Sequence, residues 1–128
     1  MKVRRVSLAF VSSVLFAALV ANPGSTGAAT GSAVALSTAG YQALAGGDAN
    51  KAVPLFTQSI ESRELGPEAL ANALLNRALA YQQLSDNGKA IDDYTAALNL
   101  DAMSPDLRAR ALYNRGLAQQ KEIGRAHV

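Results

Sequence analysis

Residues 71–102, ANALLNRALAYQQLSDNGKAIDDYTAALNLDA, contain two helical patterns on either side of a turn. The Ser-Asp-Asn-Gly run at 85–88 favours the turn, because short polar side chains and glycine compete with helical hydrogen bonding. Apolar and small residues recur at helical spacing on both sides of it and are predicted to meet in a core. These core residues are Leu74, Ala78, Tyr81, Ala90, Tyr94 and Ala97. The stretch therefore predicts two antiparallel helices that approach closely where the side chains are small.

The same pattern returns on both sides at one constant spacing, the repeat period, which places Leu36, Leu74 and Leu112 in register. Repeats of roughly 20 to 50 residues indicate stacked supersecondary units. Core positions predicted for the flanking units are Leu36, Gly40, Ala52, Phe56, Leu112 and Gly116. With turn chemistry at 46–48, 66–67 and 104–105, we expect an all-α fold of five helices. Their expected ranges are roughly 33–45, 49–65, 67–84, 88–102 and 105–123.

Residues 71–102 resemble a tetratricopeptide repeat, a helix-turn-helix unit of about 34 residues. The six core residues of this stretch match the family's apolar, small and aromatic positions, whereas Arg77 stands where leucine is usual and Ala102 where proline is usual. The resemblance covers a domain over 30–128, with units at about 33–66 and 71–104 and a partial unit at 109–128. It implies antiparallel helix-turn-helix repeats stacked as a short right-handed α-solenoid.

The resemblance also implies a function, because the first helices of such units line a concave groove that receives an extended peptide or a partner helix. The groove candidates by register are Asn72, Asn76, Leu79, Gln83, Arg110, Tyr113, Asn114, Leu117 and Lys121. Asn76 and Asn114 lie one repeat apart, and amide side chains can both donate to and accept from a peptide backbone. Structural hydrogen bonds within each repeat are the alternative for both. We expect a non-catalytic scaffold whose partner is a protein or an extended peptide.

Two features predict departures from regular repeat geometry. The repeat period exceeds the length of the family's unit by about one helical turn, and the position of Gly66 predicts a longer second helix in the first unit. Pro54 falls inside that helix, where it lacks an amide donor and crowds the carbonyl of Asn50. We therefore expect this helix to be bent or to start late.

Residues 1–29 have the pattern of a secretory signal peptide. Three basic residues among the first five precede a charge-free apolar stretch over 6–21, and helix breakers and small residues follow it. That stretch is shorter than the roughly 20 residues that a membrane-spanning helix needs; an uncleaved membrane anchor is the alternative. Cleavage is predicted after Ala28 or Ala29, with the mature protein periplasmic or secreted. Removal of residues 1–29 leaves 9 basic and 10 acidic residues. The net charge of +2 of the full sequence therefore no longer suggests a nucleic-acid partner.

The last six residues, IGRAHV at 123–128, follow only the first helix of a third unit. The hexapeptide matches the read-through of a commonly used sequencing adapter, so we expect an assembly artefact and further repeats in the natural protein. A natural short protein that ends on a single helix is the alternative. In neither case is His127 expected to act as a ligand or catalyst.

The composition excludes several kinds of chemistry. Without cysteine and with one histidine, the chain has no thiolate metal site, no cysteine nucleophile and no histidine-rich centre. Asp92 and Asp93 are adjacent, and because neighbours on a helix point in different directions, both are predicted to lie on a solvated face. The basic residues between Arg108 and Lys121 lack interleaved aromatics and are interpreted as ordinary surface. No enzyme activity, cofactor or metal is expected.

Two other functions remain open from the sequence. The chain is also compatible with the N-terminal, non-catalytic repeat region of a longer envelope enzyme. Self-association through an uncovered end of the repeat array is the other possibility, because each repeat needs a neighbour to cover its apolar face.

Overall fold

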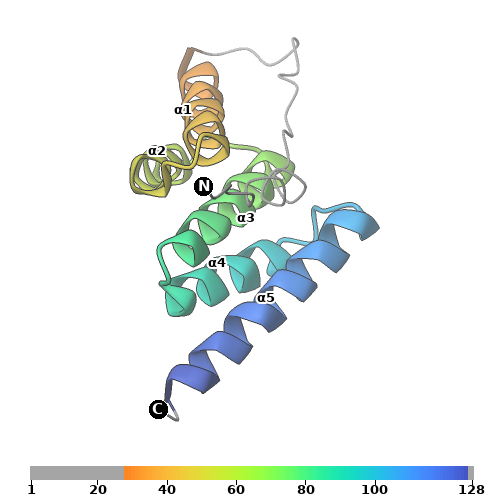
Figure 1. Ribbon diagram of the computed structural model, residues 1–128. Helices are drawn as coiled ribbons and strands as arrows, with labels where there is room; N and C mark the ends of the chain where they lie inside the picture. The colour runs from red at the N-terminus through yellow and green to blue at the C-terminus, as the bar shows by residue number, and fades with distance from the viewer. Residues whose placement is uncertain (1–27, 127–128) are drawn as a thin grey trace, which may run out of the picture.

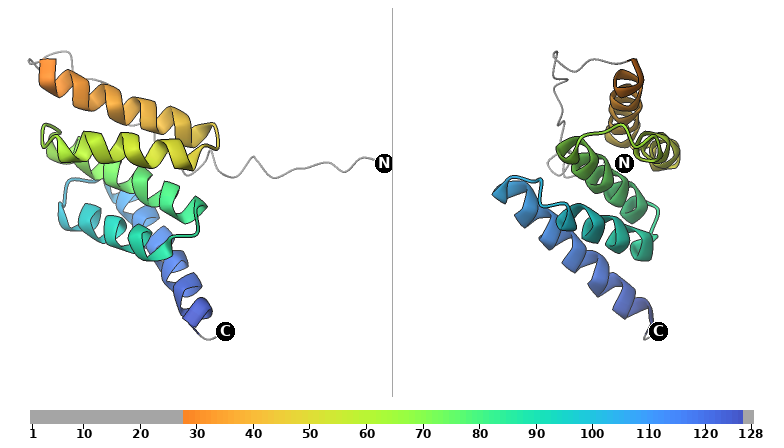
Figure 2. Two further views of the ribbon diagram at one scale, coloured as in Figure 1. Left: turned by 90° about the vertical axis from the view of Figure 1, so that its left-hand side faces the viewer. Right: turned by 180° about the vertical axis from the view of Figure 1, so that it is seen from behind.

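The computed structural model describes residues 28–126, and within them the chain forms five helices and no strand. The helices are α1 (Ala28–Ala45), α2 (Ala49–Glu61), α3 (Pro67–Gln83), α4 (Asn87–Asn99) and α5 (Pro105–Ala126). Each packs against the next in sequence, and α1 also contacts α3. Figures 1 and 2 show the array running from α1 at one end to α5 at the other. The all-α prediction is confirmed for this part of the chain.

Some sequence predictions fall outside the described residues. The predicted signal peptide lies outside them except for its last two positions, Ala28 and Ala29, where α1 begins. His127 and Val128 also lie outside them. Within residues 28–126, no helix combines the length and apolar character needed to span a membrane.

The turns inside the two complete helix pairs are near copies of each other. Oδ1 of Asp48 accepts a hydrogen bond from the backbone amide of Lys51 at 3.0 Å, and Oδ1 of Asp86 accepts one from that of Lys89 at 3.2 Å. Each aspartate thereby satisfies an amide that the first helical turn leaves without a partner. The two caps stand one repeat period apart, so the spacing seen in the sequence is also a spacing of hydrogen bonds.

The second helices of the two pairs are equally long and end in the same way. Arg63 adopts a φ of 60° and Asp101, at the same position of the next unit, a φ of 51°. A left-handed residue cannot continue a right-handed helix, so α2 ends at Glu61 and α4 at Asn99. The predicted extension of the second helix to residue 65 is therefore wrong, as is the end of the fourth at 102. Residues 62–66 and 100–104 form the connections between pairs.

The other boundary corrections concern Pro54 and the outer helices. Helix α2 does not start late, because the Asp48 cap starts it at Ala49, and Pro54 lies inside it. Helix α1 begins five residues before the predicted position 33, and α5 continues three residues beyond 123.

Helix α3 lies between two apolar clusters and joins them. Ala73 and Ala80 face the cluster built on Leu44, Ala49, Ala52 and Phe56 of the first pair. Leu74 and Ala78 belong to the other cluster, whose further members are Leu75, Ala90, Tyr94, Ala97, Leu98, Leu107, Ala111 and Ala118. The predicted core residues buried here are Gly40, Ala52, Phe56, Leu74, Ala78, Ala90, Tyr94 and Ala97, whereas Leu36 and Tyr81 are half-buried.

Candidate partner-binding surface

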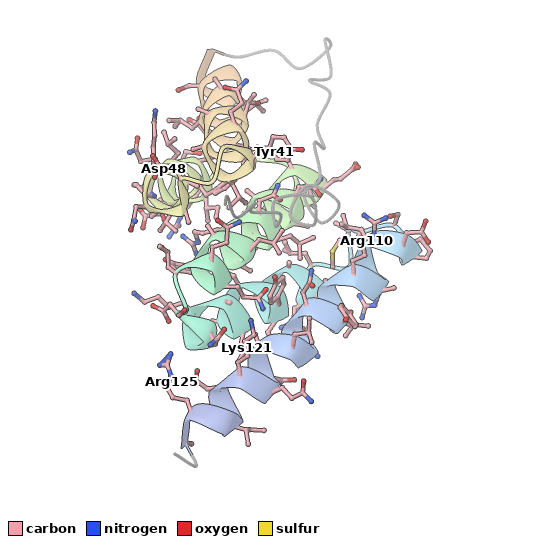
Figure 3. All side chains as sticks on the ribbon, in the orientation of Figure 1. Tyr41, Asp48, Arg110, Lys121 and Arg125 are labelled. Atoms are coloured by element: carbon pink, nitrogen blue, oxygen red, sulfur yellow. The ribbon has the colours of Figure 1, made fainter. Side chains whose placement is uncertain are left out.

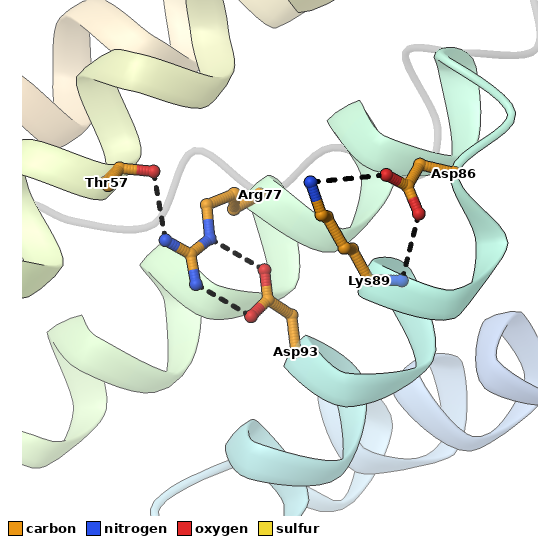
Figure 4. Close-up of polar contacts among 5 residues, drawn as sticks. All are labelled: Thr57, Arg77, Asp86, Lys89 and Asp93. Carbon is orange, nitrogen blue, oxygen red and sulfur yellow. Dashed lines mark hydrogen bonds and ion pairs between the residues drawn. The ribbon is translucent and has the colours of Figure 1, made fainter.

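One arginine side chain links the three central helices (Figure 4). Arg77 of α3 donates from Nε and Nη2 to the two carboxylate oxygens of Asp93 in α4, at 2.7 and 2.8 Å. Its Nη1 donates to Oγ1 of Thr57 in α2 at 3.0 Å. The side chains are only 17% and 9% exposed, and the hydrogen bond to Asp93, more than the opposing effect of burial, raises the pKa of Arg77. The guanidinium therefore stays charged and ties α2 to α4 across α3.

Asp93 corrects the sequence prediction for the acidic pair. Asp92 is exposed as predicted, but Asp93 is buried against Arg77. The two carboxylates still do not share a site, because they leave the helix on different sides. Asp93 faces inward since α3 lies opposite it, which no pattern within α4 itself reveals.

The contact between Arg77 and Thr57 is repeated one unit later. Nη1 of Arg115 in α5 donates to Oγ1 of Thr95 in α4 at 3.1 Å. Both residues lie one repeat period beyond their counterparts, so the first helix of each later unit is held to the preceding second helix by the same arginine–threonine bond. This pairing was missed from the sequence, although the matching register of Thr57 with Thr95 and of Arg77 with Arg115 was a readable signal.

A second polar contact crosses the α3–α4 interface. The buried Tyr94 donates its hydroxyl proton to Oε1 of Gln82 at 2.5 Å, and burial raises the pKa of the tyrosine. Tyr94 thus packs its ring in the core while its polar end keeps a hydrogen bond.

The groove candidates fall into three groups by exposure. Helix α3 is internal, and its Asn72 and Asn76 are buried. A peptide could not reach Asn72 and Asn76, because both are buried. The sequence prediction that Asn76 and Asn114 act alike is therefore corrected, since Asn114 is only half-buried. The half-buried candidates are Leu79, Asn114 and Leu117, and the exposed ones are Gln83, Arg110, Tyr113 and Lys121. Figure 3 labels Arg110 and Lys121 on α5.

Two predicted core residues of the third unit are not core. Leu112 is 45% exposed, and a Cβ built on Gly116 would meet nothing within 4 Å. Their counterparts Leu74 and Ala78 are buried because α4 lies over them, while no described helix covers α5 in that position. Helix α5 also exposes Tyr113 (68%) and Ile123 (60%). Helix α5 therefore carries three exposed large apolar side chains.

The described residues hold no cluster of side chains that could bind a metal ion. In residues 28–126, no three histidine or acidic side chains stand close enough to hold a metal ion. The shifted pKa values belong to Arg77 and Tyr94, which are engaged within the core. Helix α5 exposes both polar and apolar side chains.

In comparisons with known proteins, no protein-family model, no curated protein and no solved structure matches the chain.

Proposed function

We propose that this protein is an exported, non-catalytic interaction scaffold of the tetratricopeptide-repeat type that binds a protein or an extended peptide. In this proposal the helix pairs stack as a short right-handed solenoid, and the first helices α3 and α5 line the binding groove. The protein acts in the periplasm or outside the cell after removal of residues 1–29. Binding depends on shape and polarity and requires no cofactor.

One observation carries this proposal: α3 and α5 present surface side chains at equivalent positions. Leu79 and Leu117 are both half-buried, and Gln83 and Lys121 are both exposed, and the members of each pair lie one repeat period apart. A row of apolar and polar groups repeated along successive first helices suits an extended chain, which offers apolar side chains and backbone polar groups at regular intervals. The residues of the resembled repeat support the same interpretation.

Site-specific photo-crosslinking in the source cells tests the groove. A photoreactive phenylalanine analogue is placed at Gln83 or at Lys121, and at the exposed Gln58 of α2 as a matched control. We expect one discrete adduct from both groove positions, identified by mass spectrometry as the same partner, and no such adduct from position 58. Adducts of identical pattern at all three positions, or none at Gln83 and Lys121, contradict the proposal.

A further inference from the structure

The start of α4 contains the chain's one asparagine that is directly followed by glycine, Asn87 before Gly88. Asn87 is the first residue of the helix and follows the capping residue Asp86. Its side chain is buried, and within the described part of the chain its Oδ1 accepts no hydrogen bond. Because most buried amide groups in proteins are hydrogen-bonded, this carboxamide is unusual in that packing alone holds its oxygen.

The backbone nitrogen of Gly88 lies next to this carboxamide along the chain. It belongs to the first turn of α4, whose amides have no acceptor within the helix. The Asp86 carboxylate bonds to the amide of Lys89 instead (Figure 4). Gly88 is exposed, and a Cβ built on it would meet nothing within 4 Å. The nitrogen that follows the carboxamide therefore has neither a helical hydrogen bond nor a side chain of its own to hinder it.

The first helix pair differs at this position. Ala49 stands where α4 has Asn87, and both residues are buried at the start of their helices. The neighbouring Asn50 is exposed and is followed by Lys51. A helix start of this kind therefore does not require an amide side chain, and the asparagine–glycine pair is a particular feature of the second pair.

We infer that Asn87 is a site of spontaneous deamidation. The backbone nitrogen of Gly88 loses its proton and attacks Cγ of Asn87. The new carbon–nitrogen bond closes a five-membered imide, and the carboxamide nitrogen leaves as ammonia with the proton. Water then opens the imide at either carbonyl and gives aspartate or isoaspartate, in which the main chain runs through the side chain. Water is the one co-reactant, and nothing is oxidised or reduced. This inference is independent of the proposed scaffold function.

The reaction requires the first turn of α4 to open. The imide ring contains the Cα–C bond of Asn87, and the torsion about this bond must leave its helical value. At the first residue of a helix this rotation breaks the cap between Asp86 and Lys89 and the hydrogen bonds of one turn. Such a local opening costs much less than unfolding of the whole chain. The cap therefore controls how often the reactive conformation forms.

The product should loosen the turn of the second pair. Isoaspartate adds a methylene group to the main chain between residues 87 and 88 and moves the Lys89 amide away from the Asp86 carboxylate. It also adds one negative charge beside that carboxylate. The melting temperature of an aged sample should therefore fall below that of a fresh one. Asn87→Ala, which copies Ala49 of the first pair, should show no such fall.

Timed incubation of the purified folded chain at mildly alkaline pH tests the inference. Trypsin releases residues 78–89 as one peptide, in which Asn87 is the sole asparagine. Mass spectrometry should show this peptide gaining the mass of aspartate with time, and chromatography separates the aspartate and isoaspartate forms. A sample digested before incubation corrects for deamidation during digestion. Asn50, located by fragmentation in the same digest, is the internal control and should change at least 10-fold more slowly.

Two substitutions separate the chemistry from the opening. Gly88→Ala should slow the reaction roughly 10-fold, because a Cβ hinders the nitrogen and restricts the backbone. It should not lower the melting temperature, since its Cβ enters open space. Asp86→Ala removes the cap and should speed the reaction about 5-fold, the shift in opening that a typical cap controls. Asp48→Ala, the same change in the first pair, is the matched control and should leave the rate at Asn87 unchanged.

Three outcomes overturn the inference. If Asn87 stays intact in the folded chain and deamidates only in urea, the helix prevents the reaction. Equal rates at Asn87 and Asn50 would show that the glycine has no special effect. Equal rates in the parent and Asp86→Ala chains would reject opening of the first turn of α4 as the route.

Discussion

The first helix pair, α1 with α2, and the second, α3 with α4, have nearly the same backbone and are held together by different chemistry. In the first pair the Phe56 ring packs against Gly40, and the polar contacts between the helices lie at the buried Ser59, whose hydroxyl donates to the Ala33 carbonyl at 2.6 Å. The second pair adds a bidentate ion pair and a tyrosine–glutamine hydrogen bond at the equivalent positions. The comparison teaches that one helix arrangement accepts an apolar or a polar contact at these positions, provided that both helices change together.

Breaking the ion pair should have the largest effect. Asp93→Ala leaves the Arg77 guanidinium in the interface without its carboxylate, and removing one partner of a buried pair costs about 3 kcal/mol or more. The free energy of unfolding, from urea denaturation, should fall by about that amount. The double variant Arg77→Ala/Asp93→Leu installs the residues of the first pair and should recover most of the loss, since apolar replacement of a buried pair is often neutral. Equal losses in the single and double variants would contradict the interchangeability of the two interfaces.

Close packing at Gly40 should give the next largest effect. A Cβ at this position would lie 3.0 Å from two carbons of the rigid Phe56 ring, so Gly40→Ala forces a shift. Overpacking of this kind costs about 1–3 kcal/mol, which exceeds the roughly 1 kcal/mol that alanine gains over glycine in a helix. Gly116→Ala, in open space at the equivalent position of α5, should be stabilising. Thermal melts of both variants check the sign, and stabilisation of both would refute the packing argument.

The hydroxyl of Tyr94 should make the stability of the second pair depend on alkaline pH. Burial raises its pKa above the ordinary value of 10.0, so above pH 10 the folded chain keeps a proton that the unfolded chain releases. The free energy of unfolding then falls as pH rises past 10. Tyr94→Phe should cost about 1 kcal/mol at pH 7 through the lost hydrogen bond and should make the alkaline decline shallower. Exposed Tyr113→Phe serves as the control. An unchanged alkaline decline in Tyr94→Phe would contradict the assignment.

The caps should give the smallest difference between the pairs. Asp48→Ala and Asp86→Ala each remove a cap hydrogen bond, at a cost of about 0.5–1 kcal/mol for an exposed helix start. The Asp86 variant should lose slightly more, because the Lys89 Nζ lies 3.5 Å from its carboxylate and a surface pair contributes only a few tenths of a kcal/mol, about 0.3. Urea denaturation of both variants in low and high salt measures the difference between their losses in free energy of unfolding. The additional loss of Asp86→Ala is expected to disappear in high salt. A much larger loss at Asp48 would argue against equivalent caps.

The order and type of the helices could be predicted from the sequence because the decisive signals are local. Turn residues, the caps at Asp48 and Asp86, and the proline at the start of α3 each act on amides within one helical turn. The helix ends at Glu61 and Asn99 were predicted too late, because arginine and aspartate at Arg63 and Asp101 give little warning of a left-handed conformation.

The sequence by itself also determined the repeat register, which places Thr57 with Thr95 and Arg77 with Arg115. Only the tertiary structure decided which faces are covered: it buries Asp93 and Asn76, and it leaves Leu112 and Gly116 open. The physical reason is that a helix pattern encodes which residues share a face, whereas burial depends on whether another helix lies against that face. The same apolar and arginine pattern is therefore an interior in α3 and an exposed surface in α5.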